Sequence, residues 1–124
     1  MSTYLDFIKV LEKVALEANR DLDDIELIAV SKKKPADLIN QVIINGCQSF
    51  GENQLQEIEY KWIELKQEHP KTKLHFVGNI QSKKTEKIFQ LCDVIHSIDR
   101  EKIVQIIKSC EEEFKDKKEY FIQI

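Results

Sequence analysis

The sequence predicts an α/β fold in which short parallel strands alternate with amphipathic helices. Five segments have the length of strands, and they begin at Leu27, Gln48, Leu74, Val94 and Tyr120. Successive starts are separated by 21, 26, 20 and 26 residues, a regular spacing that is typical of strand–helix units in a parallel sheet. The first segment, Leu27–Val30, contains four consecutive apolar residues, as expected of a strand that is buried on both faces.

A helix is predicted ahead of the first strand. Over residues 4–19, apolar side chains recur at spacings of three and four, and they are Leu5, Ile8, Leu11, Ala15 and Ala18. After the first strand, Pro35 suits the first turn of a second helix, because its missing N–H is not needed there. Gly46 can end that helix in the left-handed conformation.

Three further helices are predicted between the remaining strands. Those strands are expected at Gln48–Glu52, Leu74–Val77, Val94–Ile98 and Tyr120–Ile124. Asn53, Ser82 and Asp99 stand where these helices begin, and each has a side-chain oxygen that can accept a hydrogen bond from the first turn. We therefore expect a single domain over residues 1–124, built from a leading helix and five strands with four helices between them.

Two architectures accommodate this order of elements. An open doubly wound five-stranded sheet would be complete within 124 residues, and the periodicity alone favours it. A (β/α)8 TIM barrel typically needs ~250 residues, so this chain would supply a leading helix and about five parallel strands of a partial barrel. The sequence stops on the apolar strand Tyr120–Ile124 without a helix to cover it, which favours the partial barrel.

The composition excludes several classes of partner. Nineteen basic and 22 acidic residues give a net charge of −3, so no overall field attracts nucleic acid or an acidic membrane surface. No apolar run reaches the length that spans a bilayer, and the first ten residues do not have the pattern of a signal peptide. Three separated cysteines, without a metal-binding spacing, are expected to be free buried thiols in a reducing cytoplasm.

Polar side chains follow the predicted strands at the places where the strands end. In a parallel sheet these carboxyl ends meet at one edge, where ligands bind. The side chains expected there include Lys32, Asn53, Asn79, Gln81 and Ser97. This set contains an amine, amides and a hydroxyl, but no Ser–His or Cys–His pair. His75 and His96 fall inside strands, and we interpret them as hydrogen-bonded histidines that line the core or a barrel.

Four sequence segments together resemble the pyridoxal phosphate homeostasis proteins, single-domain relatives of the alanine racemase N-terminal barrel. The matching patterns are A-V-S-K-x-K-P at Ala29–Pro35, F-G-E-N-x-x-Q-E at Phe50–Glu57, H-F-x-G-x-I/L-Q-x-K-K at His75–Lys84, and H-S-I-D-R at His96–Arg100. Each pattern alone is weak, whereas four in this order and at these spacings are specific. The resemblance spans essentially the whole chain but only the front half of the family's length.

The resemblance implies that Lys32 forms an internal aldimine with the aldehyde of pyridoxal 5′-phosphate, and that Asn53 lies near the cofactor ring. A lysine attacks a carbonyl only as the neutral amine, so burial or neighbouring cations must lower its pKa. Lys33 and Lys34 follow directly, and we interpret them as a source of charge. Capping of the next helix is the rival role of Asn53.

The resemblance favours a non-catalytic protein of vitamin B6 homeostasis that holds and passes on the cofactor. A racemase-like enzyme is the first alternative, although it needs a second acid–base group on the opposite face of the cofactor, and none stands out. A truncated fragment that binds no ligand is the second alternative. The resemblance implies that the phosphate-binding groups lie in the family's later strands, outside these residues. The first and fifth strands would each have an unpaired edge, so we expect self-association or pairing with a missing C-terminal half.

Overall fold

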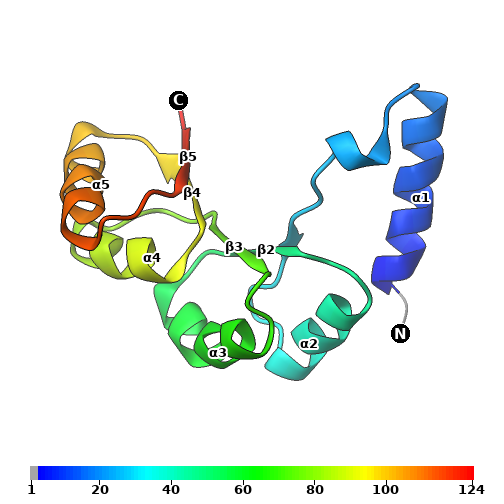
Figure 1. Cartoon of the computed structure of the whole chain (residues 1–124), viewed down its shortest axis with the longest axis horizontal. Helices are drawn as coiled ribbons and strands as arrows, with labels where there is room; N and C mark the ends of the chain where they lie inside the picture. Colours follow the sequence, from blue (N-terminus) through cyan, green and yellow to red (C-terminus); the bar gives the residue numbers. More distant parts are fainter. Residues whose placement is uncertain (1–2) are drawn as a thin grey trace.

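The computed structural model of the chain describes residues 3–124, which form five parallel strands in one sheet together with helices (Figure 1). The α-helices are α1 (Thr3–Glu17), α2 (Ala36–Ile44), α3 (Leu55–Glu68), α4 (Thr85–Leu91) and α5 (Glu101–Phe114). The strands are β1 (Ala29–Val30), β2 (Ser49–Glu52), β3 (Lys73–Phe76), β4 (Val94–Ile98) and β5 (Glu119–Ile122). Two short 3-10 turns, η1 (Leu22–Asp24) and η2 (Ser82–Lys84), complete the described part.

The order of the strands decides between the two predicted architectures. The strands are hydrogen-bonded in the order β1-β2-β3-β4-β5, which is also their order along the chain, and every neighbouring pair is parallel. A doubly wound sheet needs a point at which the strand order reverses, and this sheet contains none within residues 3–124. The partial (β/α)8 barrel is therefore confirmed, and the open doubly wound alternative is wrong.

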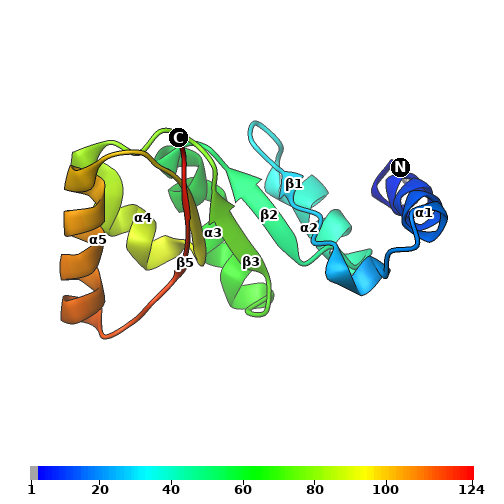
Figure 2. The ribbon, with the colours of Figure 1, turned by 90° about the horizontal axis from the view of Figure 1, so that it is seen from above.

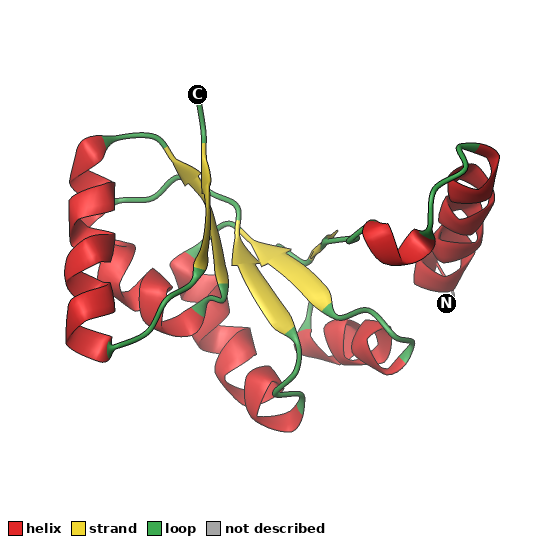
Figure 3. Cartoon of the chain, turned by 45° about the horizontal axis from the view of Figure 1, so that its top comes forward, coloured by secondary structure: helices red, strands yellow, loops and turns green. Residues whose placement is uncertain are grey.

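Sequential parallel strands place their connecting helices on one face. Right-handed crossovers that always advance in the same direction return to the same side of the sheet. Figures 1 and 3 show α2 to α5 along the convex side of the curved strands. Figure 2 shows α1 set apart from the sheet, at the end opposite to α5. The concave side of the sheet has no helix over it among the described residues.

The register of the strands determines which side chains face the helices. Phe50 pairs with Leu74, and both are buried against the helices. Two residues further on, Phe76 pairs with Ile95 in the same buried layer. The core includes Trp62 of α3, whose ring centroid lies 5.3 Å from that of Phe50. Truncating such a buried aromatic ring costs about 3–5 kcal/mol, so this layer anchors α3 to the sheet.

The helix ends agree only in part with the sequence predictions. Gly46 follows the C-cap of α2 with φ +112°, which confirms its predicted left-handed conformation. The predicted caps Asn53, Ser82 and Asp99 are wrong, because each helix begins at least one residue later than the sequence suggested. The residues at the N-cap positions are Gln54, Lys84 and Arg100, and none of them makes a side-chain capping bond. Ser82 instead opens the 3-10 turn η2.

The three cysteines, Cys47, Cys92 and Cys110, are free and buried, as predicted. Burial raises the pKa of the Cys92 thiol to about 12, with a further contribution from the Asp93 carboxylate, so this thiol is inert. Within residues 3–124, no helix combines the length and the apolar character that crossing a bilayer would require.

Candidate functional site

Lys32 lies on a tight turn that follows β1 at the carboxyl edge of the sheet. The Ser31 N–H donates to the Gly51 carbonyl at 2.9 Å, which continues the ladder one residue beyond β1. The Lys34 N–H then donates to the Ser31 carbonyl at 3.1 Å and closes the turn. Lys33 has φ +61°, a conformation that L-residues rarely adopt. The Lys32 side chain is exposed at the top of this turn.

Lys61 of α3 lies beneath the turn and contacts both of its ends. Its ammonium group donates to the Ser31 carbonyl at 2.9 Å and to the Lys34 carbonyl at 3.1 Å. The same group forms ion pairs with Glu52 at 2.8 Å and Glu57 at 3.0 Å. Lys61 is only 5% exposed, and a buried ammonium needs such partners to offset the loss of hydration.

Glu52 is the carboxylate at the centre of this arrangement. It is fully buried at the end of β2, and its Oε2 accepts from Ser31 Oγ at 2.6 Å and Trp62 Nε1 at 3.0 Å. The other oxygen, Oε1, is buried without a hydrogen-bond partner. Because a buried carboxylate is costly to leave unpaired, Glu52 and Lys61 stabilise each other, and they tie β1, β2 and α3 together.

Glu57 supports the turn from the first part of α3. Its Oε1 accepts from the Lys33 N–H at 2.6 Å, so the middle of the turn is also bonded to a side chain. Burial acts to raise the pKa of Glu57, but the Lys33 hydrogen bond and the Lys61 ammonium lower it overall. Glu57 is therefore held as the charged acceptor that this backbone N–H prefers.

Asn53 follows β2 directly, at the same carboxyl edge of the sheet at which Lys32 follows β1. The two strands pair in parallel as far as Val30 and Gly51, and Lys32 and Asn53 each lie two residues beyond this pair. Asn53 is partly buried, and its side chain makes no hydrogen bond within residues 3–124. It also lacks the capping role that was its rival interpretation. The structure therefore leaves this amide available for another group.

The loop after β3 approaches Asn53 closely. A Cβ atom at Gly78 would lie 2.4 Å from the Asn53 carbonyl oxygen, so only glycine fits here. Together they line a cleft of about 470 Å³ at the carboxyl ends of β2 and β3. Asn79 and Gln81, two of the side chains predicted at this edge of the sheet, line the same cleft. Ser97 lies outside this cleft, with φ +63° and a hydroxyl that donates to the Val77 carbonyl at 3.4 Å.

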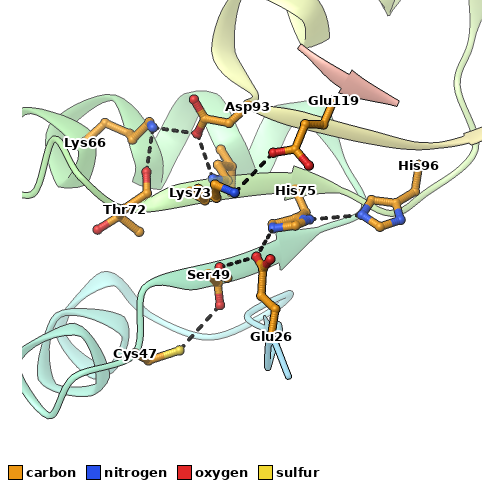
Figure 4. Close-up of polar contacts among 11 residues, drawn as sticks. Glu26, Cys47, Ser49, Lys66, Thr72, Lys73, His75, Asp93, His96 and Glu119 are labelled. Atoms are coloured by element: carbon orange, nitrogen blue, oxygen red, sulfur yellow. Dashed lines mark hydrogen bonds and ion pairs between the residues drawn. The ribbon is translucent and has the colours of Figure 1, made fainter. Parts of the chain in front are cut away.

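A second polar cluster occupies the concave face, one layer nearer the amino ends of the strands (Figure 4). His75 Nδ1 lies 3.0 Å from His96 Nε2, and His75 Nε2 lies 3.3 Å from Glu26 Oε2. Ser49 donates to Glu26 at 2.6 Å, and the His96 ring stacks on Phe121. His75 and His96 are thus hydrogen-bonded histidines on adjacent strands, which confirms their interpretation.

This cluster has electrostatic properties that differ from those of an active acid–base pair. Burial lowers the pKa of both His75 and His96, and the pKa of His75 is lowered further by the neighbouring His96. The Ser49 hydrogen bond lowers the pKa of Glu26 in spite of an opposing effect of burial. At neutral pH the two imidazoles are therefore neutral and Glu26 is ionised. The cluster lies nearer the amino ends of the strands than Lys32 and Asn53, and His75 Nε2 is buried with only the 3.3 Å approach to Glu26.

The sequence reasoning predicted Lys32 and Asn53 as cofactor-binding residues and did not predict a role for the three residues that support the turn. Glu57 and Lys61 are four residues apart on α3, a spacing that usually marks a solvent-exposed ion pair. Glu52 was expected only as the last residue of a strand. Their common function becomes visible when the packing of α3 against β2 brings Lys61 under Ser31.

Comparison with known proteins finds relatives that this chain matches over only part of their own length. No family model matches the chain. A pyridoxal phosphate homeostasis protein of Pseudomonas aeruginosa is 42% identical over 95 residues, which are 77% of this chain and 40% of that protein. Proteins of the same name from Vibrio cholerae and Pasteurella multocida are 38% and 32% identical, and the matches cover 75% and 92% of this chain. They cover 40% and 49% of those two relatives.

Solved structures show the same fold. PipY of Synechococcus elongatus, solved with PLP bound, superposes with a TM-score of 0.76 and 31% identity over 88% of this chain and 51% of that chain. A protein of unknown function from Bifidobacterium adolescentis superposes with a TM-score of 0.80, at 22% identity, over 90% of this chain and 50% of that chain. At that identity the second likeness shows the fold alone.

The chain spans about 40–51% of the length of these relatives. The curated matches share one name, and the aligned part has the parallel strand order expected of the front of a barrel. In sequence and in fold, the chain therefore matches the N-terminal portion of the pyridoxal phosphate homeostasis proteins.

Proposed function

We propose that this chain is part of a protein of vitamin B6 homeostasis that binds pyridoxal 5′-phosphate without turning it over, as an aldimine of Lys32. The observation that carries the proposal is the position of Lys32, an exposed amine on a supported turn at the carboxyl edge of a parallel sheet. Ligands of such sheets bind at that edge. PLP is bound in the structure of the related PipY, and the curated relatives are named for pyridoxal phosphate homeostasis.

The residues present fit part of this cofactor. The amine of Lys32 can condense with an aldehyde, a step in which nitrogen bonds to the carbonyl carbon and water leaves. The amide of Asn53 makes no hydrogen bond within residues 3–124, lies at the same edge of the sheet and can donate or accept a hydrogen bond at the ring. The cleft beside it is lined by Asn79, Gln81 and Lys84, which are polar groups suited to an anionic ligand.

A racemase-like activity would need a second acid–base group facing the ring. The described residues nearest to that role are His75 and His96, which hydrogen-bond to each other one layer below Lys32. This arrangement supports a binding role over proton transfer to a substrate. An assay of alanine racemisation tests the distinction, and racemisation that is lost in the Lys32→Ala variant would contradict the binding role.

We further propose that residues 1–124 form one domain and that copies of it associate through the concave face of the sheet. The outermost strands β1 and β5 each have one edge without a strand partner among the described residues. Unpaired strand edges and an uncovered sheet face favour association.

The experiment that tests the cofactor proposal traps the bond at Lys32. The chain is incubated with pyridoxal 5′-phosphate, reduced with borohydride and digested, and the modified peptides are identified by mass spectrometry. We expect one dominant adduct, at Lys32, and a visible absorbance band that disappears in the Lys32→Arg variant. Lys33→Arg is the matched control, since Lys33 lies in the same turn and keeps its charge. Adducts distributed evenly over the exposed lysines would contradict the proposal.

A further inference from the structure

We propose that Lys61 and Glu57 of α3 are positioning residues for Lys32, because together they hold the turn Ser31–Lys34 that carries it. This inference rests on the proposed function of Lys32. It concerns residues that contact only the backbone of the turn, so neither of them is expected to touch the cofactor. Lys61 and Glu57 fix the shape of the turn through hydrogen bonds from α3 to its backbone.

The contacts of Lys61 fix the width of the turn. Its ammonium group bonds to the carbonyls of Ser31 and Lys34, at 2.9 Å and 3.1 Å, and these are the first and last residues of the turn. One cation between two carbonyls keeps both ends at a set distance from α3. The cation cannot move away easily, because Glu52 and Glu57 hold it from the other side at 2.8 Å and 3.0 Å.

Glu57 fixes the middle of the turn. Lys33 has φ +61°, and a residue with a Cβ occupies this conformation only when its surroundings support it. The support is the hydrogen bond of 2.6 Å from the Lys33 N–H to Glu57 Oε1. Three backbone groups of the turn are thus bonded to side chains of α3.

The burial of Lys61 points to a specific role. An ammonium that is 5% exposed has lost most of its hydration, and apolar side chains in place of the whole ion pair with Glu52 would often be neutral or stabilising. What an apolar side chain could not do is bind the two carbonyls of the turn. The side chain of Lys32, by contrast, is exposed. A fixed backbone with an unhindered amine is the arrangement that favours capture of an aldehyde in one orientation.

The same helix also affects the position of Asn53, the second residue proposed to contact the cofactor. α3 begins at Leu55, two residues after Asn53, and its first turn contains Glu57. A displacement of α3 therefore moves Asn53 and the Lys32 turn together. We infer that the relative position of these two side chains is set by α3 through Lys61 and Glu57.

The test compares two substitutions of Glu57. Glu57→Ala removes the acceptor for the Lys33 N–H, whereas Glu57→Gln keeps a carbonyl oxygen at the same reach and should rescue the turn. Glu59→Ala is the matched control, because Glu59 is an exposed glutamate of the same helix. For Lys61, the double variant Lys61→Met with Glu52→Gln avoids leaving a buried carboxylate unpaired. Circular dichroism and thermal melting establish that each variant is folded.

Two measurements are made on each folded variant. The first is amide hydrogen exchange at Lys33 and Lys34 by NMR, where we expect exchange to be at least about tenfold faster in Glu57→Ala and in the double variant. The second is the initial rate of adduct formation at Lys32, trapped with borohydride, where we expect a decrease of about tenfold or more in the same variants. Glu57→Gln and Glu59→Ala should resemble the wild-type chain in both measurements.

The outcomes separate this inference from the proposed function. A wild-type chain without an adduct at Lys32 would overturn the proposed function and, with it, the positioning role. A wild-type adduct whose rate is unchanged in Glu57→Ala and in the double variant would overturn only the positioning role. Unchanged amide exchange in both variants would also overturn it, since the turn would then hold its shape without α3.

Discussion

Gly78 shows how one backbone position controls the environment of Asn53. A Cβ added at Gly78 would lie 2.4 Å from the Asn53 carbonyl oxygen and 2.9 Å from its Cα, so the backbone would have to move. We expect Gly78→Ala to lower the free energy of unfolding by about 1–3 kcal/mol, the usual cost of overpacking. Urea denaturation followed by tryptophan fluorescence measures this change.

Gly46 provides the control for that prediction. A Cβ at Gly46 would meet nothing within 4 Å, but the residue has φ +112°. Gly46→Ala should therefore lower the free energy of unfolding only through backbone strain, by about 1–2 kcal/mol. The two variants differ in their effect on Asn53, since only Gly78→Ala displaces it. An adduct rate at Lys32 that falls equally in both variants would contradict a local effect of Gly78.

His75 and His96 predict how stability depends on pH. Burial lowers the pKa of both imidazoles in the folded chain below their ordinary value of 6.5. The unfolded chain then binds protons that the folded chain does not, so the free energy of unfolding falls as the pH drops below about 6.5. The loss is complete once the pH is below the folded pKa values. The charged groups facing the pair are Glu26 and, for His75, Lys73.

Urea unfolding between about pH 7.5 and pH 5 tests this dependence. We expect the slope of unfolding free energy against pH to flatten in the double variant His75→Gln with His96→Gln. Glu26 acts in a separate and lower range, because its lowered pKa gives stability that is lost only as the pH falls below about 4.5. A wild-type stability that is constant from pH 7.5 to pH 5 would contradict the role of the two histidines.

At the scale of the residue, the sequence predicted those parts of the site that follow strand ends. Lys32 and Asn53 could be predicted because each comes within two residues of the end of a strand, and parallel strands bring such positions to one edge. Lys61 could not be located in this way. Its spacing from Glu57 is equally compatible with a solvated ion pair, and its burial depends on contacts with Ser31 and Glu52, which are distant in the sequence.

At the scale of the element, the ion pair between Lys61 and Glu52 joins α3 to the end of β2. Both side chains are buried, at 5% and 0% exposure. Lys61→Met leaves the Glu52 carboxylate buried without its cation, and we expect a loss of about 3–5 kcal/mol in the free energy of unfolding. The double variant with Glu52→Gln should recover most of this loss, because the buried charge is removed as well.

A double-mutant cycle measures the coupling between these two side chains. The cycle uses the two single variants, the double variant and the wild-type chain, each unfolded in urea. A coupling energy near zero would show that Lys61 and Glu52 act independently, contrary to the geometry of their 2.8 Å contact. Residual destabilisation in the double variant is expected from the lost bonds to the Ser31 and Lys34 carbonyls.

The predicted elements were more accurate in their interiors than at their ends. Val94–Ile98 was predicted with its observed bounds, because it is a short segment with apolar residues at both ends and a clear helix on each side. The first strand was predicted from Leu27 but is paired only at Ala29 and Val30. As an edge strand it has a neighbour on one side alone, and apolar composition does not report how many residues pair. The capping predictions failed for a similar reason, since they depend on single-residue geometry.

At the scale of the whole molecule, the order of the strands could not be derived from periodicity. The same strand–helix spacing fits a sheet that reverses its order and one that does not. The resemblance to a barrel family and the uncovered last strand favoured the sequential order, which the structure confirms. The sequential order places every crossover helix on one side of the sheet, so no helix covers the concave face within residues 3–124.

That uncovered face is the basis of the prediction of self-association. Val30 and Phe121 stand on the outermost strands of the concave side, and each is 52% exposed. Ile122 of β5 is 77% exposed. Apolar groups beside unpaired strand edges are sites at which sheets add to one another. We therefore expect the average mass in solution to rise above the 14.6 kDa of one chain as the concentration increases from micromolar to submillimolar.

Size-exclusion chromatography with light scattering measures this mass, and two substitutions locate the contact. Phe121→Lys places a charge on the concave side of β5 and should return the chain toward the monomer. Tyr60→Lys is the matched control, because Tyr60 is 89% exposed on α3 at the convex side of the sheet. If copies associate through the concave face, only Phe121→Lys lowers the average mass. A wild-type chain that stays monomeric and melts cooperatively would show that the sheet is stable with its concave face in water.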